Sequence, residues 1–254
     1  MLKLFRQQKV QEVFDAPLAA EGRIYAIGDV HGRLDLLGEM VDKILQDAAD
    51  ADGVPRVIFL GDLIDRGEDS HGVVEFVMTM RTWPEIETHV IMGNHEQMMI
   101  DFLIDPASGA RWLRHGGLQT LMSYGTPTHG SVHQPGTLEQ TRDELREAMG
   151  PHRAFLEALP ASHRNGNILF AHAGANPSLS IGAQDEDTLI WGHPRFFDEM
   201  RTDGIWVVHG HTVVEDPMVE HGRVSVDTGA YFSNRLSAVR LENDQLKFLS
   251  VATD

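Results

Sequence analysis

The chain has 254 residues, a length that fits one large α/β domain or two small ones. It contains no cysteine, which excludes thiolate nucleophiles, disulfides and cysteine-ligated zinc. Its formal charge is −17, with 38 acidic against 21 basic residues, and this balance disfavours non-specific binding to nucleic acid.

The amino-terminal residues 1–22 show weak periodicity and are expected to form a short extension. No apolar run in the sequence resembles a signal peptide or approaches the length of a membrane span. Together with the absence of cysteine, this favours a cytoplasmic protein that does not bind membranes.

The first hundred residues predict a βαβαβ arrangement. Each of three apolar runs is followed by a stretch in which apolar residues recur at helical spacing. Such alternation predicts parallel strands joined by right-handed crossovers. The strands are expected at residues 23–27, 57–60 and 89–92.

The rest of the chain changes character twice. Residues of about 105–165 predict a helical insertion, with a surface loop rich in glycine, proline and threonine at 125–136. From residue 167 onward, short strands separated by turn residues predict a second sheet with mostly antiparallel pairing. These strands are expected at 168–171, 205–208, 223–226, 236–241 and 246–251. We expect residues 23–254 to form a single domain.

Polar clusters follow the predicted strands. Residues 28–32, 61–67 and 93–96 recur at nearly equal spacing, and each cluster follows an apolar run. The carboxyl ends of parallel strands meet at one edge of a sheet, where open α/β folds bind ligands. Oxygen and nitrogen ligands suit divalent metals, so the sequence predicts a dinuclear metal site. The candidate ligands are Asp29, His31, Asp62, Asn94, His172 and one of the pair His209 and His211.

The motifs resemble those of the calcineurin-like metallophosphoesterases. The matching segments are GDVHG at 28–32, GDLIDRG at 61–67, GNHE at 93–96, AHAG at 171–174, GHT at 210–212 and DTGA at 227–230. More narrowly, they are similar to the phosphoprotein phosphatases, in the bacterial and phage branch that includes the phage lambda enzyme. The resemblance implies an α/β fold (α+β in some schemes): a four-layer αββα sandwich of two mixed sheets flanked by helices, with the metals at strand carboxyl ends.

The resemblance also implies a role for each matching position. The first metal would be held by Asp29, His31 and Asp62, and the second by Asp62, Asn94, His172 and His211. His95 would protonate the leaving oxygen, with Asp65 orienting its ring. Arg66 and Asn94 would bind the phosphate. The metals are expected to be two divalent ions, Mn²⁺ by the resemblance, although the ligands also permit Fe and Zn²⁺.

One position departs from the family pattern, and three other features have roles that the resemblance does not assign. The phage-like enzymes carry a second phosphate-binding arginine where this chain has His193, and Arg195 is our candidate to replace it. His209 is expected to be structural rather than a ligand. The role of the DTGA segment stays open between support of the metal ligands and plain turn chemistry. His115 is a candidate for a loop near the site.

Function follows from the same resemblance. The main prediction is a serine/threonine protein phosphatase acting on phosphorylated protein or peptide by in-line attack of a metal-bridging hydroxide. The alternative is a symmetrical dinucleoside polyphosphate hydrolase, such as a diadenosine tetraphosphate hydrolase, or a phosphatase of small metabolites. Asp65 favours the protein phosphatases, because the symmetrical hydrolases tend to carry alanine there. A non-catalytic scaffold is disfavoured because every ligand position is intact. The oligomeric state stays open.

Overall fold

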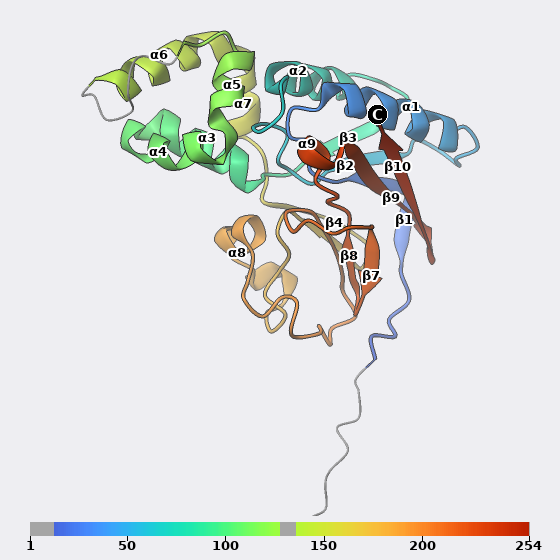
Figure 1. Cartoon of the computed structure of the whole chain (residues 1–254). Helices are drawn as coiled ribbons and strands as arrows, with labels where there is room; N and C mark the ends of the chain where they lie inside the picture. The colour runs from blue at the N-terminus through green and yellow to red at the C-terminus, as the bar shows by residue number, and fades with distance from the viewer. Residues whose placement is uncertain (1–12, 128–135, 254) are drawn as a thin grey trace, which may run out of the picture.

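The computed structural model describes residues 13–127 and 136–253, and it is built on two five-stranded sheets. The first sheet has the strand order β10-β9-β1-β2-β3, and the second has the order β4-β5-β6-β8-β7. In Figure 1 the first sheet lies above the second, with helices on the far side of the first. The fold is therefore mixed α/β with two mixed sheets flanked by helices, as expected.

The first sheet combines three strands from the amino-terminal part of the described chain with two from its carboxyl-terminal part. Strand β1 pairs in parallel with β2, and β2 pairs in parallel with β3. On its other side, β1 pairs with β9 in antiparallel register, and β9 pairs with β10. The five strands are β1 (Ala20–Ile27), β2 (Arg56–Phe59), β3 (Glu87–Val90), β9 (Arg235–Asn243) and β10 (Gln245–Ala252).

The second sheet is built around three parallel strands. Strand β5 pairs in parallel with β6, and β6 pairs in parallel with β8. Strands β4 and β7 pair antiparallel at the two edges. The strands are β4 (Ser162–Asn165), β5 (Ile168–Ala171), β6 (Trp206–His209), β7 (Met218–Glu220) and β8 (Arg223–Ser225).

Helices cover the sheets, and those between β3 and β4 gather in a lobe drawn green to yellow in Figure 1. Outside the lobe lie α1 (Leu34–Asp47), α2 (Ser70–Met80), η3 (Ile181–Ala183), α8 (Glu186–Trp191) and α9 (Ala230–Ser233). The helical lobe contains α3 (Asn94–Ile104), η1 (Pro106–Ser108), α4 (Gly109–Trp112), the π-helical turn η2 (Leu113–Gly117), α5 (Leu118–Ser123), α6 (Thr137–Met149) and α7 (Pro151–Glu157).

Strand β1 is buried on both faces, and its side chains show which layer lies on each side of the first sheet. Ile24 and Ala26 pack in an apolar cluster with Phe170 of the second sheet. Their neighbours along the strand, Tyr25 and Ile27, pack instead with helix α1. Because successive side chains of a strand point to opposite faces, this alternation places one core between the sheets and another under the helices.

The structure corrects the sequence prediction at several places. Strands β9 and β10 extend the first sheet rather than the second, and the centre of the second sheet is parallel rather than antiparallel. Strand β4 lies inside the range predicted as helical insertion, and β1 begins at Ala20 rather than at residue 23. Residues 1–12 of the predicted extension and residues 128–135 of the predicted loop lie outside the described residues. No helix in the described part of the chain has the length and apolarity to cross a membrane.

Candidate metal centre and phosphate site

The predicted ligands lie in the loops that follow five strands. Asp29 and His31 follow β1, Asp62 follows β2, and Asn94 opens helix α3 just after β3. From the second sheet, the ligands His172 and His211 follow β5 and β6. The loops meet because β1, β2 and β3 are parallel, as are β5 and β6.

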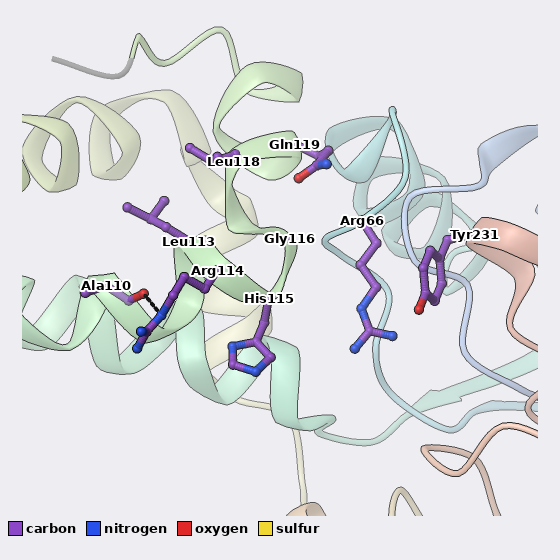
Figure 2. A pocket seen from close by; sticks show the side chains of 9 residues that line it. All are labelled: Arg66, Ala110, Leu113, Arg114, His115, Gly116, Leu118, Gln119 and Tyr231. Carbon is purple, nitrogen blue, oxygen red and sulfur yellow. Dashed lines mark hydrogen bonds between the residues drawn. The ribbon is translucent and has the colours of Figure 1, made fainter. Parts of the chain in front are cut away.

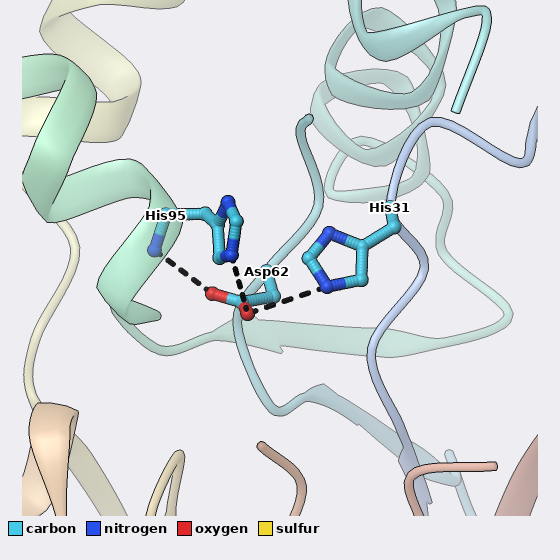
Figure 3. A group of neighbouring side chains, drawn as sticks. All are labelled: His31, Asp62 and His95. Atoms are coloured by element: carbon cyan, nitrogen blue, oxygen red, sulfur yellow. Dashed lines mark hydrogen bonds and ion pairs between the residues drawn. The ribbon is translucent and has the colours of Figure 1, made fainter. Parts of the chain in front are cut away.

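Asp62 lies at the middle of this group. Its Oδ2 is 3.5 Å from His31 Nε2, and its Oδ1 is 3.4 Å from His172 Nε2. Figure 3 shows His31 and His95 on the two sides of its carboxylate. Two groups of donor atoms lie within 4.8 Å of one another, one formed by His31, Asp62 and His95 and the other by Asp62, His172 and His211. Asp62 belongs to both groups, so its carboxylate can bridge two cations.

Asn94 completes the second group. Its Oδ1 lies 2.9 Å from His172 Nε2 and 2.9 Å from His211 Nδ1, while the two nitrogens are 3.2 Å apart. The three atoms come from both sheets and point to one place. A carbonyl oxygen and two imidazole nitrogens at this spacing form a donor set suited to a divalent transition metal.

The hydrogen bonds of two histidines test whether a cation fits. His31 Nδ1 donates to the carbonyl oxygen of Ile64 at 2.8 Å, and His172 Nδ1 donates to that of Leu60 at 2.8 Å. A carbonyl oxygen can only accept, so each ring presents an unprotonated Nε2 to Asp62 when the ring is neutral. Burial lowers the pKa of His31 to about 3, which keeps it neutral. Lone pairs facing a carboxylate need a cation between them, so the residues present fit a metal.

The buried carboxylates of Asp29, Asp62 and Asp227 also indicate a cation site, because they lie close enough to repel one another. Burial raises the pKa of Asp29, and the negative charges of Asp227 and Asp62 raise it further. Burial also raises the pKa of Asp227. Asp29 accepts from the backbone N–H of His211 at 3.1 Å and is absent from the two described donor groups. Asp227 accepts from Gly229 N at 2.8 Å, so the DTGA segment makes a turn and also places a carboxylate beside Asp29.

His95 is held by a carboxylate that is itself fully bonded. His95 Nδ1 lies 2.7 Å from Asp65 Oδ2. Asp65 also accepts from Trp112 Nε1 at 2.9 Å and from Thr120 Oγ1 at 2.6 Å, and it is completely buried. Burial alone would lower the pKa of His95, but Asp62 and Asp65 outweigh it and raise that pKa. The arrangement fixes the ring and favours its protonated form.

Arg66 reaches the same place from the loop after β2. Its Nη2 lies 3.0 Å from His95 Nε2, and its Cζ lies 4.7 Å above the ring of Tyr231. Its backbone N–H donates to Gly116 O at 3.3 Å. The turn therefore fixes the backbone of Arg66 and the Tyr231 ring packs on its guanidinium, whose edge faces His95 and the candidate metal ligands, where it can bind phosphate oxygens.

Backbone strain accompanies these positions. Positive φ places a non-glycine residue in the left-handed region, at a cost of about 1–2 kcal/mol each. Strained residues of this kind cluster at functional sites, where the backbone conformation sets the direction of the side chains. The same loops also require glycine, because a Cβ on Gly61 would lie 2.5 Å from Gly93 N. The site residues with positive φ are His31, Asp62, Asp65, Arg66 and His211.

Sequence reasoning missed Glu96. Its buried carboxylate accepts backbone N–H bonds from Asp62 and Leu63 at 2.8 Å each, and from Gly93 at 3.0 Å. It therefore ties the loop that carries Asp62 to the start of helix α3. The signal was in the sequence, since Gly93 to Glu96 has the spacing of a helix capping box.

The Glu96→Gln variant is expected to lose about 2 kcal/mol of unfolding free energy, because its amide group would face backbone donors that need an acceptor. Glu157→Gln is the matched control: Glu157 accepts from Arg153 on an exposed helix surface at 2.7 Å, so its loss is expected to stay below about 0.5 kcal/mol. Urea denaturation of both variants measures the difference. Equal stabilities would contradict the role given to Glu96.

The remaining predicted residues lie as follows. His209 is buried, with Nδ1 3.0 Å from Gly210 O and Nε2 2.9 Å from Ser225 Oγ, as a structural histidine would be. Arg195 is exposed, and its Nη1 lies 3.1 Å from Glu199, so its contact with phosphate stays a prediction. His193 accepts from the backbone of Arg195 at 3.3 Å. His115 lines a pocket with Arg66.

Comparison with known proteins identifies the fold. A solved protein-tyrosine phosphatase from a psychrophilic Shewanella species superposes with a TM-score of 0.62 at 17% identity, covering 95% of this chain and 81% of that one. A protein described provisionally as a diadenosine tetraphosphatase superposes with a TM-score of 0.61 at 18% identity, covering 93% and 98%. At such identities the likeness shows a common fold and leaves the substrate open.

Sequence relatives extend over most of the chain. The protein of Oceanobacillus iheyensis is 29% identical over 91% of this chain and 92% of its own length. The protein of Bacillus subtilis is 26% identical over 84% and 88%. Both are described as asymmetrical bis(5'-nucleosyl)-tetraphosphatase PrpE.

The family model described as calcineurin-like phosphoesterase matches residues 22–215. That range contains each predicted metal ligand, from Asp29 to His211, and the loops that bring them together. The chain therefore belongs to the calcineurin-like phosphoesterase family and is a metal-dependent phosphoesterase.

Proposed function

We propose that this protein hydrolyses dinucleoside tetraphosphates, with the asymmetrical cleavage that releases a nucleoside triphosphate and a nucleoside monophosphate. The observation that carries the proposal is the similarity, over nearly the whole chain, to relatives described by that activity. This favours the dinucleotide alternative over the protein phosphatase that the motifs alone favoured, although the relatives are described as asymmetrical rather than symmetrical.

The motifs carry little information about the substrate, for a physical reason. Asp65, Arg66 and His95 act on the transferred phosphoryl group and on the first leaving oxygen. These atoms are common to phosphoserine and to a nucleotide anhydride, so the residues around them carry little information about the rest of the substrate. Specificity belongs to the walls of the site instead.

Two divalent cations fit the donor groups around Asp62. Asp29, His31 and Asp62 would hold one, and Asp62, Asn94, His172 and His211 the other; Mn²⁺ is our proposal, and the donors also suit Fe and Zn²⁺. When bound, such ions lower the pKa of a water and neutralise charge on phosphate oxygens.

The protein's own groups then divide the work. Arg66 binds phosphate oxygens with its planar fork, and Asn94 can donate to another from its amide nitrogen. Asp65 holds His95 Nδ1 at 2.7 Å, which turns Nε2 toward Asp62 at 3.9 Å. A proton on His95 Nε2 can thus pass to the leaving oxygen, and the raised pKa keeps that proton available near neutral pH.

The test is an assay of metal-stripped protein to which Mn²⁺, Zn²⁺ or Mg²⁺ is returned. The substrates are diadenosine tetraphosphate and peptides carrying phosphoserine, phosphothreonine or phosphotyrosine. We expect ATP and AMP in equal amounts from the dinucleotide, resolved by ion-exchange chromatography, and activity that depends on added metal. Two molecules of ADP would show symmetrical cleavage instead. Dephosphorylation of the phosphoserine or phosphothreonine peptide without dinucleotide turnover would restore the serine/threonine phosphatase as the better assignment.

A further inference from the structure

A pocket of about 860 Å³ opens beside Arg66. Figure 2 shows Arg66 and Tyr231 on one side of it and His115, Arg114 and Leu113 on the other, with Leu118 and Gln119 above. The far wall is the π-helical turn η2 and the start of α5. The pocket therefore begins at a residue that faces the metal ligands and leads away from them.

The π-helical turn brings the two walls together. Gly116 has φ +114°, and a Cβ there would lie 2.6 Å from Arg66 N. Its carbonyl oxygen accepts the Arg66 N–H bond, so the turn and the phosphate-binding loop form one unit. Side chains on this turn are consequently fixed relative to the reacting phosphate.

The charge of the pocket differs from that of the protein. Arg66, Arg114 and His115 line it, and no carboxylate is among its described lining residues, although acidic residues exceed basic ones by 38 to 21 overall. A second pocket shares Arg66 and Tyr231 but is also lined by carboxylates. Those carboxylates are Asp35, Glu68 and Asp69. Of the two spaces that adjoin Arg66, the first is the one suited to a polyanion.

The other lining residues match a nucleoside. Leu118 is 43% exposed and, with Leu113, supplies an apolar surface on which a purine ring can pack. Gln119 is exposed at the same rim, and its amide offers the paired donor and acceptor that adenine can bond. Apolar walls with a few polar groups at the rim are typical of a small-molecule site.

We propose that this pocket binds the nucleotide on the leaving side of the cleaved bond, with its polyphosphate along Arg66, Arg114 and His115 and its base against Leu118 and Gln119. The inference rests on the proposed function, whose substrate it explains. A small phosphomonoester would reach the metals and Arg66 but leave the pocket empty. The pocket would thus determine the preference for dinucleotides.

The experiment compares kcat/KM for diadenosine tetraphosphate with kcat/KM for p-nitrophenyl phosphate, expressed as a ratio, in the Mn²⁺-loaded protein. Arg114→Ala and His115→Ala are each expected to lower the ratio about 10-fold, mostly through KM for the dinucleotide. Arg164→Ala is the matched control. Like Arg114, Arg164 is exposed and donates from Nε to one backbone carbonyl, but it lies on β4 and is not among the pocket residues. Its ratio should match that of the unaltered protein.

The outcomes separate the two proposals. If the unaltered protein cleaves the dinucleotide while both pocket variants keep its ratio, the pocket assignment is wrong and the proposed function stands. If the unaltered protein hydrolyses p-nitrophenyl phosphate but no dinucleotide, both are wrong. A ratio that falls equally in the Arg164 control would mean a general effect of charge, which also overturns the pocket.

Discussion

Replacing Asp62 by asparagine is expected to lower kcat by at least about 10³-fold, which corresponds to about 4 kcal/mol of lost transition-state stabilisation. Asp62 is the residue shared by the two donor groups, with one carboxylate oxygen toward His172 and the other toward His31. Asparagine keeps one oxygen but loses the charge and the second acceptor. It therefore cannot bridge two cations, and the arginine and histidines beside it lose their counter-charge.

The substitution isolates charge from structure. Asp62 has φ 51°, a conformation that asparagine adopts more readily than most residues. Its Oδ1 accepts from the His95 N–H at 3.0 Å, a bond that an amide oxygen can also make. Metal content by mass spectrometry should fall from two ions per chain toward one or none. Asp101→Asn is the control, because Asp101 is exposed on α3 and accepts one side-chain bond, from Gln97 at 2.8 Å. Full metal content with near-normal kcat in the Asp62 variant would contradict the bridge.

The convergence of the candidate ligands could be predicted from sequence because each of them stands in a local pattern. An apolar strand followed by a glycine-flanked polar cluster is visible within about ten residues, and parallel pairing of the strands then brings the clusters together. The structure brings His31, Asp62, Asn94, His172 and His211 to one centre, and Asp29 one hydrogen bond away. Strand order accounts for the meeting of the clusters within each sheet, and the packing of the two sheets then brings His172 and His211 to Asn94.

The assignment of strands to sheets could not be predicted in the same way. Strand β9 pairs with β1 across more than two hundred residues, and nothing within either strand marks its partner. Both faces of β1 are buried from Ile24 to Ile27, so this stretch is apolar throughout and carries no alternation that would indicate its place in a sheet. Short edge strands such as β4 and β7 have too few residues for a clear alternation of apolar and polar side chains.

The groups that support the proposed catalytic residues were equally hidden. Trp112 and Thr120 bond Asp65 across 47 and 55 residues of chain, from a lobe whose packing no periodicity reveals. The proposed substrate pocket was hidden for a related reason. Arg114 and His115 belong to a turn that becomes a pocket wall only when Gly116 packs on Arg66. Sequence motifs describe the reacting phosphate well and the rest of the substrate poorly.

His95→Asn is expected to slow phenyl phosphate hydrolysis by about 10²–10³-fold, the range of a lost general acid. The effect on p-nitrophenyl phosphate should stay below about 10-fold, because its leaving group is stable as an anion and needs no proton. Asp65 would lose its partner at 2.7 Å, while Trp112 and Thr120 would still hold its carboxylate. The measurement is kcat for both esters with saturating Mn²⁺. His89→Asn is the control, since His89 also pairs with one carboxylate, Glu87 at 2.9 Å, outside the site.

Metal content decides between two roles for His95. Its ring nitrogen lies within 4.8 Å of donor atoms of His31 and Asp62, so geometry alone also allows it to be a ligand. A ligand would be needed equally for both esters, and its loss would release metal. A general acid would leave metal content unchanged and separate the esters by leaving group. Because His95 Nδ1 bonds Asp65, and because Asp62 and Asp65 raise the pKa of His95 against the opposing effects of burial and the Arg66 cation, we expect the second result. Equal slowing of the two esters with loss of one metal ion would reassign His95 to the metal site.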